Sequence, residues 1–176
     1  MGYTTEFNGS FNISPNLTYE HMEFLTKLSQ TRRMARNVGP EYGIEGEFYA
    51  DGKGDFGQAH DSTIIDYNTP PKTQPGLWLQ WIPISNNKLA WDECEKFYCY
   101  VEWLQYLIDK FFKPNKYILN GSVTFQGETP SDYRTIEVNN NVIDVHGYVI
   151  SDDIEPNQIP EKHESKDDNK YLIENK

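Results

Sequence analysis

Residues 95–112 read EKFYCYVEWLQYLIDKFF and contain the most regular apolar pattern in the chain. Large apolar side chains recur there at the spacing that places them on one face of a helix. They are Phe97, Val101, Leu104, Ile108 and Phe111. Asp92 and Glu95 have the spacing of a capping box before a helix. The pattern predicts an amphipathic helix over residues 93–112, with its apolar face on the core of the protein.

Runs with alternating or continuous apolar residues lie on both sides of this helix and predict strands. These runs cover residues 3–13, 45–50, 77–82, 88–91, 117–126, 134–138 and 142–150. A second helix is expected over residues 19–35, with Thr18 as its N-cap and Gly39 after its end. The order of these elements predicts an α+β fold. We expect two helices packed on a mainly antiparallel sheet, in a ferredoxin-like (split βαβ) sandwich with extra strands.

The length of 176 residues fits a single domain, which we expect over residues 1–150. Residues 51–76 are rich in glycine and proline and lack sustained periodicity. A loop of this length inside a compact domain is usually functional or disordered. Residues 151–176 are acidic and almost free of apolar side chains, so we expect them to form a disordered tail.

Composition and charge exclude several classes of protein. Aromatic residues make up 14% of the chain, which argues against disorder throughout, and the net charge of −11 argues against direct nucleic-acid binding. No apolar run approaches the length of about 18 residues that a membrane span needs, so no membrane partner is expected. The first residues lack the basic and apolar regions of a signal peptide, and Cys94 and Cys99 are expected to be buried, reduced thiols. We therefore expect a cytoplasmic protein.

Gly52, Gly54 and Gly57 match the G-x-G-x-x-G pattern of dinucleotide-binding loops. That interpretation requires a helix to begin at the glycines, because the N-terminus of the helix binds the pyrophosphate. The residues that follow show no helical period and lead into a proline-rich stretch. We therefore reject a dinucleotide site, and we expect no cofactor and no metal.

Three of the four arginines lie close together at the end of the expected helix 19–35. They are Arg32, Arg33 and Arg36. A guanidinium binds phosphate or carboxylate through two parallel hydrogen bonds, so these residues are candidates for an anion-binding site. Two alternatives remain open: cations also stabilise the C-terminus of a helix, and the arginines could form ion pairs inside the protein.

His60 and Asp61 are candidates for acid–base chemistry, because a histidine beside carboxylates in a glycine-rich loop can transfer protons. Glu102, on the expected helix 93–112, is a third candidate. A solvent-exposed loop histidine without a catalytic role is the alternative. The histidine, cysteine and acidic residues do not have the spacing of a known metal motif.

Aromatic residues are dense in residues 77–106 and define a candidate interaction surface. The residues proposed for it are Trp78, Gln80, Trp81 and Trp103. Rings of this size dominate the energetics of protein interfaces and also of protein cores. Packing in the core is therefore the alternative.

Four strings of residues are similar to those of a family of small uncharacterised proteins from bacteria and their viruses. They are TRRM at residues 31–34, QPGLW at 74–78, EKFYCYVEWL at 95–104, and NG at 120–121 with QGE at 126–128. The resemblance covers residues 3–145 and implies no activity, so it assigns no catalytic residue. It marks these strings as places where a site could lie. The composition, rich in asparagine and lysine, fits an AT-rich genome such as that of a virus.

We interpret the sequence as a cytosolic binding or interaction module that presents the aromatic sheet surface and the 51–76 loop to an unknown protein. The first alternative is a binder of a small anionic ligand, or an enzyme, with its site between that loop and the sheet. The second is an acidic inhibitor that mimics nucleic acid and binds in a basic groove. The sequence leaves open whether the protein is an enzyme.

Overall fold

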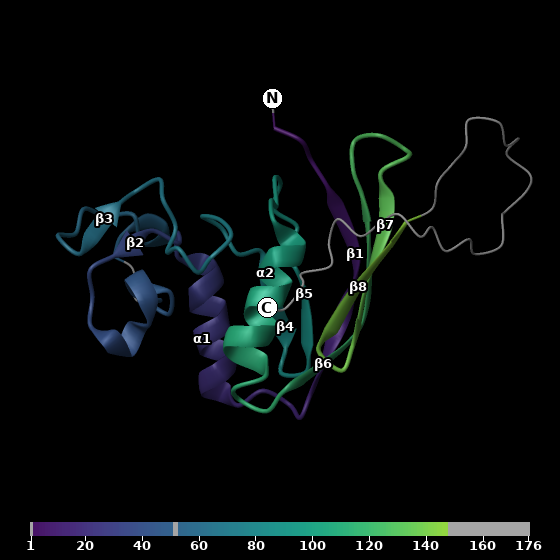
Figure 1. Ribbon diagram of the computed structural model, residues 1–176, viewed down its shortest axis with the longest axis horizontal. Helices are drawn as coiled ribbons and strands as arrows, with labels where there is room; N and C mark the ends of the chain where they lie inside the picture. Colours follow the sequence, from purple (N-terminus) through teal and green to yellow (C-terminus); the bar gives the residue numbers. More distant parts are fainter. Residues whose placement is uncertain (1, 51–52, 148–176) are drawn as a thin grey trace, which may run out of the picture.

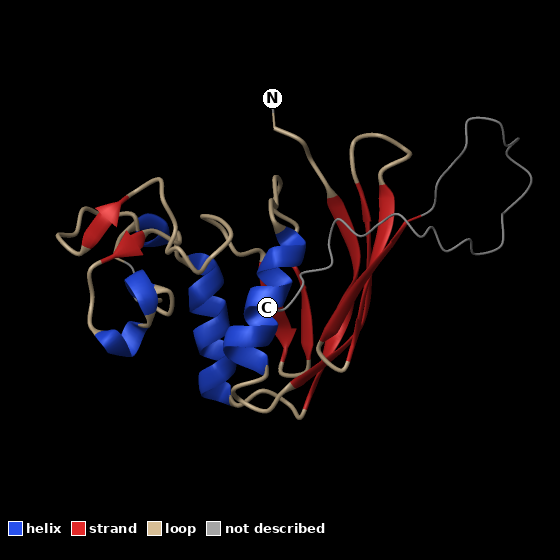
Figure 2. Ribbon diagram, viewed as in Figure 1, coloured by secondary structure: helices blue, strands red, loops and turns tan. Residues whose placement is uncertain are grey.

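A six-stranded antiparallel sheet organises the protein (Figures 1 and 2). The computed structural model describes residues 2–50 and 53–147. The strands lie in the order β4-β5-β1-β6-β7-β8. Their bounds are β1 (Glu6–Ser14), β4 (Trp81–Ser85), β5 (Lys88–Trp91), β6 (Ile118–Gln126), β7 (Tyr133–Asn139) and β8 (Val142–Gly147). This architecture confirms the predicted α+β class, with helices on a mainly antiparallel sheet.

Two helices, α1 (Tyr19–Gln30) and α2 (Tyr100–Leu107), lie on one side of the sheet (Figure 2). A π-helical turn at Ile108–Phe112 prolongs α2. Alternation along the central strands sends apolar side chains toward these helices. The largest fully buried apolar residues of the resulting core include Phe11, Trp81, Leu89, Trp103, Leu104 and Phe112. Among the described residues, no helix is long and apolar enough to cross a membrane.

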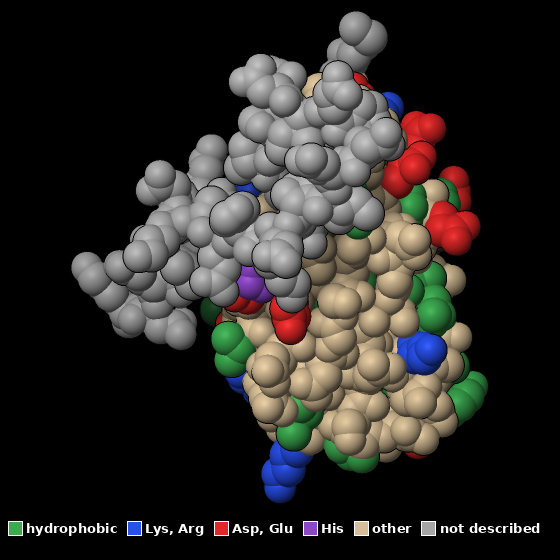
Figure 3. All heavy atoms as spheres, turned by 90° about the vertical axis from the view of Figure 1, so that its right-hand side faces the viewer, with side chains coloured by type: hydrophobic (Ala, Val, Ile, Leu, Met, Phe, Trp, Pro, Cys, Tyr) green, Lys and Arg blue, Asp and Glu red, His purple; other side chains and the backbone are tan. Residues whose placement is uncertain are grey.

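The opposite face of the sheet is polar. Side chains that alternate with the core residues on β1 and β6 point to this face, and they are mostly small and uncharged. They include Asn8, Ser10, Asn12, Asn120, Ser122 and Thr124. Figure 3 views this side of the molecule and shows a broad area with few charged groups. The one-sided burial explains why the period of two was visible in the sequence of these strands.

Helix α1 begins where the sequence predicted and ends earlier. The hydroxyl of Thr18 accepts a hydrogen bond from the backbone N–H of His21, at 3.2 Å, and caps the helix. Thr31 has an extended backbone, with φ −109° and ψ 124°. The predicted helix over residues 19–35 therefore stops at Gln30, and the three arginines lie beyond its end rather than on its last turn.

Residues 32–50 and 53–78 form a lobe beside α1, on the side of the molecule away from β7 and β8 (Figure 1). Within it, β2 (Ala35–Arg36) pairs with β3 (Ile64–Asp66). Short 3₁₀ turns occur at Pro40–Tyr42, Ile44–Gly46 and Asp55–Gly57. The strand predicted over residues 45–50 is wrong, because Glu45 and Gly46 take left-handed φ values of 53° and 75° and fold the chain back.

The segment before α2 departs from the predicted helix. Glu93, Lys96 and Cys99 have left-handed φ values, so the helix begins at Tyr100. The carboxylate of Asp92 accepts from the N–H of Cys94 within a turn instead of capping a helix. Cys94 and Cys99 are both exposed free thiols, contrary to the expected burial. The segment folds this way because its backbone and side chains bond the end of the sheet: the Trp91 indole donates to the Cys94 carbonyl.

The remaining strand predictions vary in accuracy. The strands expected over residues 88–91, 117–126 and 134–138 are confirmed within one residue or two at each end. The strand expected over 77–82 is displaced to β4. Leu77 belongs to the lobe instead, because its carbonyl accepts a hydrogen bond from the backbone N–H of Arg33. The last residues of the strand expected over 142–150, and the tail expected over 151–176, lie outside the described residues.

Candidate functional site

Arg33 is the most buried charged residue of the lobe, at 1% exposure. Its guanidinium donates to the backbone carbonyls of Tyr49 at 2.7 Å, Glu47 at 3.0 Å and Gly46 at 3.3 Å, and to the side-chain oxygen of Gln74 at 3.3 Å. Burial lowers the pKa of Arg33 to about 10, so it stays charged at neutral pH. An outside anion would have to displace these acceptors. The geometry therefore does not support the predicted anion-binding role for Arg33 and indicates that it holds the lobe together.

A buried polar network connects this arginine to α2. The Gln74 amide donates to the Glu47 carbonyl at 2.7 Å and to the Tyr106 hydroxyl at 3.0 Å. The Tyr106 hydroxyl donates to the Glu47 carboxylate, at 3.0 Å. Burial raises the pKa of Tyr106, because the charged phenolate would lose its hydration. The network fixes the position of the lobe relative to the helical layer.

Arg36 is also buried, and it holds the turn at Asp55–Gly57. Its guanidinium donates to the Gly57 carbonyl at 3.1 Å and to the Thr63 hydroxyl at 3.2 Å, and it lies over the Tyr49 ring. The Asp61 carboxylate lies 3.7 Å from the same guanidinium. A hydrogen bond from the Thr63 N–H, together with Arg36, lowers the pKa of Asp61. Arg36, like Arg33, has acceptors within the lobe in place of the predicted anion.

Arg32 differs from the other two arginines because it is partly exposed. Its guanidinium donates to the Tyr67 carbonyl at 3.0 Å and to the Asn68 side chain at 3.3 Å. It also lies 5.7 Å from the centre of the Trp78 ring, within range of a cation–π interaction. Arg32 is thus the one predicted anion ligand that reaches the surface.

Three aromatic residues that contact Arg32 define, together with it, a surface that we call the ring surface. They are Phe56, Tyr67 and Trp78. Phe56 is 51% exposed and packs edge-on against Trp78, with ring centres 5.6 Å apart. Tyr67 is also exposed, and its hydroxyl lies 3.2 Å from Nδ1 of His60. The ring surface brings together two predicted residues, Arg32 and Trp78, and one that the sequence did not single out, Phe56.

Phe56 has a left-handed backbone, with φ 50° and ψ 32°. A bulky side chain rarely takes this conformation, which costs on the order of 1–3 kcal/mol unless the surroundings impose it. The surroundings do impose it, because the Arg32 N–H donates to the Phe56 carbonyl at 3.0 Å and Arg36 holds the next residue, Gly57. The ring of Phe56 is therefore held at the surface in a strained turn.

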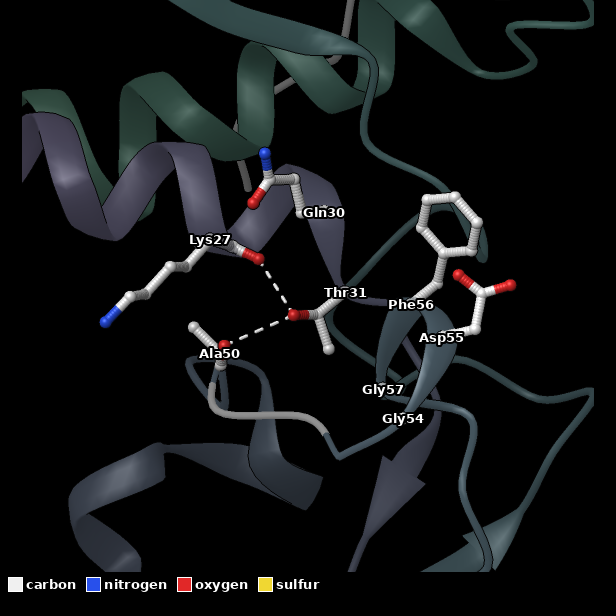
Figure 4. A pocket seen from close by; sticks show the side chains of 8 residues that line it. All are labelled: Lys27, Gln30, Thr31, Ala50, Gly54, Asp55, Phe56 and Gly57. Atoms are coloured by element: carbon white, nitrogen blue, oxygen red, sulfur yellow. Dashed lines mark hydrogen bonds between the residues drawn. The ribbon is translucent and has the colours of Figure 1, made fainter.

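A pocket of about 590 Å³ opens beside this turn (Figure 4). The end of α1 forms one wall and the turn at Asp55–Gly57 forms the other, and Figure 4 shows the two facing each other across the opening. The lining residues are Lys27, Gln30, Thr31, Ala50, Gly54, Asp55, Phe56 and Gly57. The Thr31 hydroxyl bridges the carbonyls of Lys27 and Ala50, at 2.8 and 3.2 Å, and fixes the floor of the pocket. Phe56 belongs to both the pocket and the ring surface.

The predicted surface of sheet aromatics is not exposed. Trp81 and Trp103 are fully buried, and Gln80 is buried with them. The Trp81 indole donates to the Tyr100 carbonyl at 2.8 Å, and the Gln80 side chain accepts from the Trp91 indole. Trp81 packs in the core because the helices cover that face of the sheet, and Trp103 is a core residue of α2 itself. Of the predicted surface, Trp78 alone is partly exposed.

The three candidates for proton transfer are not assembled into one site. His60 is exposed, Asp61 is bound to Thr63 and Arg36, and Glu102 is exposed on the first turn of α2. None of the three lines the pocket. Their catalytic role stays a prediction without a cavity to support it. Among the described residues, no group of three or more histidines, cysteines and acids could hold a metal ion.

The sequence analysis missed the buried network of Glu47, Gln74 and Tyr106 around Arg33, and it missed Lys27 of the pocket. Gln74 lies in the QPGLW string that the resemblance marked, and Phe56 stands between glycines that had been examined for a nucleotide motif. No protein-family model, curated protein or solved structure matches the chain. Function therefore has to be argued from the geometry of the lobe.

Proposed function

We propose that this chain is a binding module that contacts a protein partner through the ring surface and the adjacent pocket. The observation that supports this most strongly is Phe56, which is half exposed and held in a strained conformation between Trp78 and the pocket. Strained residues persist where the surrounding structure imposes them, and they concentrate at functional sites.

The composition of the ring surface supports a protein partner. Tryptophan, tyrosine and arginine are the residues that most often carry the binding energy of protein interfaces. Here Trp78 and Arg32 contact Phe56, and hydrogen bonds to the Tyr67 carbonyl and the Asn68 side chain hold Arg32 in place. A surface that is already ordered loses little conformational entropy on binding. The pocket beside Phe56 would accept one side chain of the partner.

A small anionic ligand is the second candidate, and the pocket is the observation that favours it. Its volume lies within the usual range for small-molecule sites, and Lys27, whose ammonium lies 3.3 Å from the Glu23 carboxylate on α1, lines its wall. Asp55 on the opposite wall and the polar lining oppose a purely anionic or apolar ligand. For this reason we place the protein partner first.

We also propose that the core is a ferredoxin-like sandwich. Strands β1 and β4 run parallel with β5 between them, because each is antiparallel to β5. Strands β5 and β6 run parallel with β1 between them for the same reason. Each of these split pairs is connected in sequence through one helix, α1 or α2, and β7 and β8 extend the sheet beyond β6. These relations support two interlocked split βαβ units.

The proposed function is tested with Phe56→Gly. Glycine takes the left-handed conformation without strain, so we expect this variant to be as stable as the natural chain, or more stable by up to about 1 kcal/mol. At the same time it removes the ring, so capture of partners by the immobilised chain from a lysate of its source cells should be lost. Thermal unfolding measures the first effect, and quantitative mass spectrometry of captured proteins measures the second.

Ile84→Ala is the matched control, because Ile84 is as exposed as Phe56, at 55%, but lies on edge strand β4. It should leave capture unchanged. A Phe56→Gly variant that captures the same proteins as the natural chain would contradict the proposal. A thermal shift with inorganic phosphate or small carboxylates that disappears in Lys27→Ala would favour the small-ligand candidate instead.

A further inference from the structure

The two edges of the sheet are protected to different degrees. Edge strand β4 contains Pro83, which lacks a backbone N–H, and its register with β5 shifts between Pro83 and Ser85. Proline and irregular pairing are two of the means by which an edge strand avoids pairing with another chain. Edge strand β8 has neither. It pairs with β7 without a shift, from Arg134↔Gly147 to Asn139↔Val142.

The free backbone groups of β8 follow from the hairpin that begins it. Asn140 and Asn141 form a two-residue turn with left-handed φ values of 49° and 66°, and Asn139 and Val142 close it. The closing pair of such a hairpin exchanges hydrogen bonds, and the pattern then alternates along the ladder. Val142, Asp144 and His146 therefore bond to β7. Ile143, Val145 and Gly147 direct their N–H and C=O groups away from it, and no described strand lies on that side.

We propose that β8 pairs antiparallel with β8 of a second copy of this chain, with the two-fold axis at Val145. This register joins the free backbone groups of both strands: Val145 meets Val145, and Ile143 meets Gly147. It also places Asp144 of each copy opposite His146 of the other, because both side chains occupy the polar face of the sheet. A carboxylate opposite a histidine can accept a hydrogen bond from the ring N–H, whereas like charges opposite each other destabilise a cross-strand pair.

The charges of β8 select this register over its neighbour. An axis at Asp144 would place the two Asp144 carboxylates opposite each other. Within one copy, His146 already lies 3.4 Å from the Asp144 carboxylate and 3.3 Å from that of Glu137 on β7. In the dimer, Asp144 of the second copy would approach His146 from the open edge of β8. The interface is thus self-complementary, as a two-fold contact requires.

The helix side of the sheet gives a second reason for the pairing. Ile143 and Val145 point to that side and pack only partly against the core, because the helical layer contacts mainly β4 and β6. A second β8 would place another Val145 and Ile143 beside them and would continue the apolar row that begins at Ile136 and Val138 on β7. Figure 1 shows β8 at the side of the molecule away from the lobe, so a dimer formed here leaves the ring surface free. The inference therefore does not depend on the proposed function.

Sedimentation of the full-length chain tests the proposal. We expect a reversible monomer–dimer equilibrium at concentrations up to about 200 µM, which covers micromolar dissociation constants. Asp144→Lys and His146→Glu should each weaken dimerisation by about tenfold or more, because the first removes the carboxylate that faces His146 and the second places two carboxylates opposite each other. An equimolar mixture of the two variants should form a heterodimer of nearly natural affinity, since the introduced lysine then faces the introduced glutamate. Rescue by mixing excludes misfolding as the cause.

Glu20→Lys is the matched control, because it makes the same change of charge at an exposed position on α1 and should leave dimerisation unchanged. Two results would overturn the proposal. One is a chain that stays monomeric over the whole range; protection of the amides of Ile143, Val145 and Gly147 in that monomer would show that the chain covers its own edge. The other is dimerisation that neither variant weakens.

Discussion

The sheet with its helices and the lobe are held together by different interactions. The sheet and helices enclose apolar side chains, with Phe11, Trp81 and Phe112 fully buried among many others. Among its described residues, the lobe buries few apolar side chains, chiefly Met34 and Ala35. What it buries instead are the charged and polar side chains of Arg33, Arg36, Glu47 and Gln74.

This difference has a consequence for how each region tolerates change. An apolar core distributes its stability over many contacts, so that a single shortened side chain removes part of it. The carbonyls of residues 46, 47 and 49 in the lobe converge on one guanidinium. The same guanidinium also donates to the Gln74 side chain, so the loss of this single arginine would remove four buried hydrogen bonds of the lobe at once.

The largest effect that we predict is for Arg33→Met. It removes the guanidinium that donates to the carbonyls of Gly46, Glu47 and Tyr49 and to the Gln74 side chain. Removing one partner of a buried charged network typically costs about 3–5 kcal/mol. We expect the amides of the lobe to lose protection by that amount in hydrogen exchange, whereas the amides of β1 and β6 keep theirs.

Leu104→Ala supplies the comparison in the helical layer. Leu104 is fully buried, so the substitution should lower the free energy of unfolding by about 2–5 kcal/mol and should reduce protection in the sheet. Uniform loss of protection in Arg33→Met, including the sheet, would mean that the two regions unfold as one unit and would contradict the distinction between them.

The same difference explains which elements could be predicted from the sequence. The strands of the sheet and α2 bury one face each, so their apolar residues recur with periods of two and about 3.6. Residues 45–50 end in a short apolar run, Phe48 to Ala50, and the sequence predicted a strand there. In the structure their carbonyls bond Arg33, more than ten residues earlier in the chain, and no local pattern records such a partner.

The candidate site could be predicted only in part, for related reasons. The cluster of arginines was correctly singled out as unusual, but the spacing could not show that the acceptors of Arg33 and Arg36 lie in the same chain. The tryptophans could not be assigned because large rings occur both in cores and in interfaces. In the structure Trp81 and Trp103 are buried between the sheet and the helical layer. Phe56 became visible only through its backbone conformation, which no residue pattern specifies.

A smaller effect is expected at the junction between the two regions, for Tyr106→Phe. The variant removes the hydroxyl that donates to the Glu47 carboxylate and accepts from Gln74, and an unsatisfied buried group costs about 1–3 kcal/mol. Protection in the lobe should fall, although less than in Arg33→Met. Hydrogen exchange measured by mass spectrometry resolves the location.

Tyr117→Phe is the matched control, because Tyr117 is also a buried tyrosine whose hydroxyl contacts two groups, the His21 ring at 2.8 Å and the Thr18 N–H at 3.3 Å. Both groups belong to the start of α1, so this variant should affect the helical layer and leave the lobe unchanged. Equal losses of lobe protection in the two variants would show that the hydroxyl of Tyr106 does not anchor the lobe.

The smallest predicted effect is a dependence on pH that has opposite signs in two parts of the molecule. In the lobe, hydrogen bonds from the backbone N–H groups of Thr63 and Asn68 lower the pKa values of Asp61 and Asp66. Near the start of α2, burial raises the pKa of Asp92. A carboxyl whose pKa is lowered by folding stabilises the fold when it is ionised, and one whose pKa is raised stabilises the fold when it is protonated.

Acidification from about pH 5 to about pH 3 passes through the ordinary range of aspartate pKa values. Over this range we expect the lobe to lose protection, because Asp61 and Asp66 take up protons more readily once the lobe opens. The segment around Asp92 should gain protection over the same range, because its carboxyl is protonated more readily in the folded state. Amide exchange corrected for its intrinsic pH dependence measures both changes.

The double variant Asp61→Asn/Asp66→Asn should abolish the change in the lobe and keep the change around Asp92, and Asp92→Asn should do the reverse. A lobe whose protection does not change with pH would show that these two hydrogen-bonded carboxylates, unlike the buried arginines, do not contribute to holding it closed.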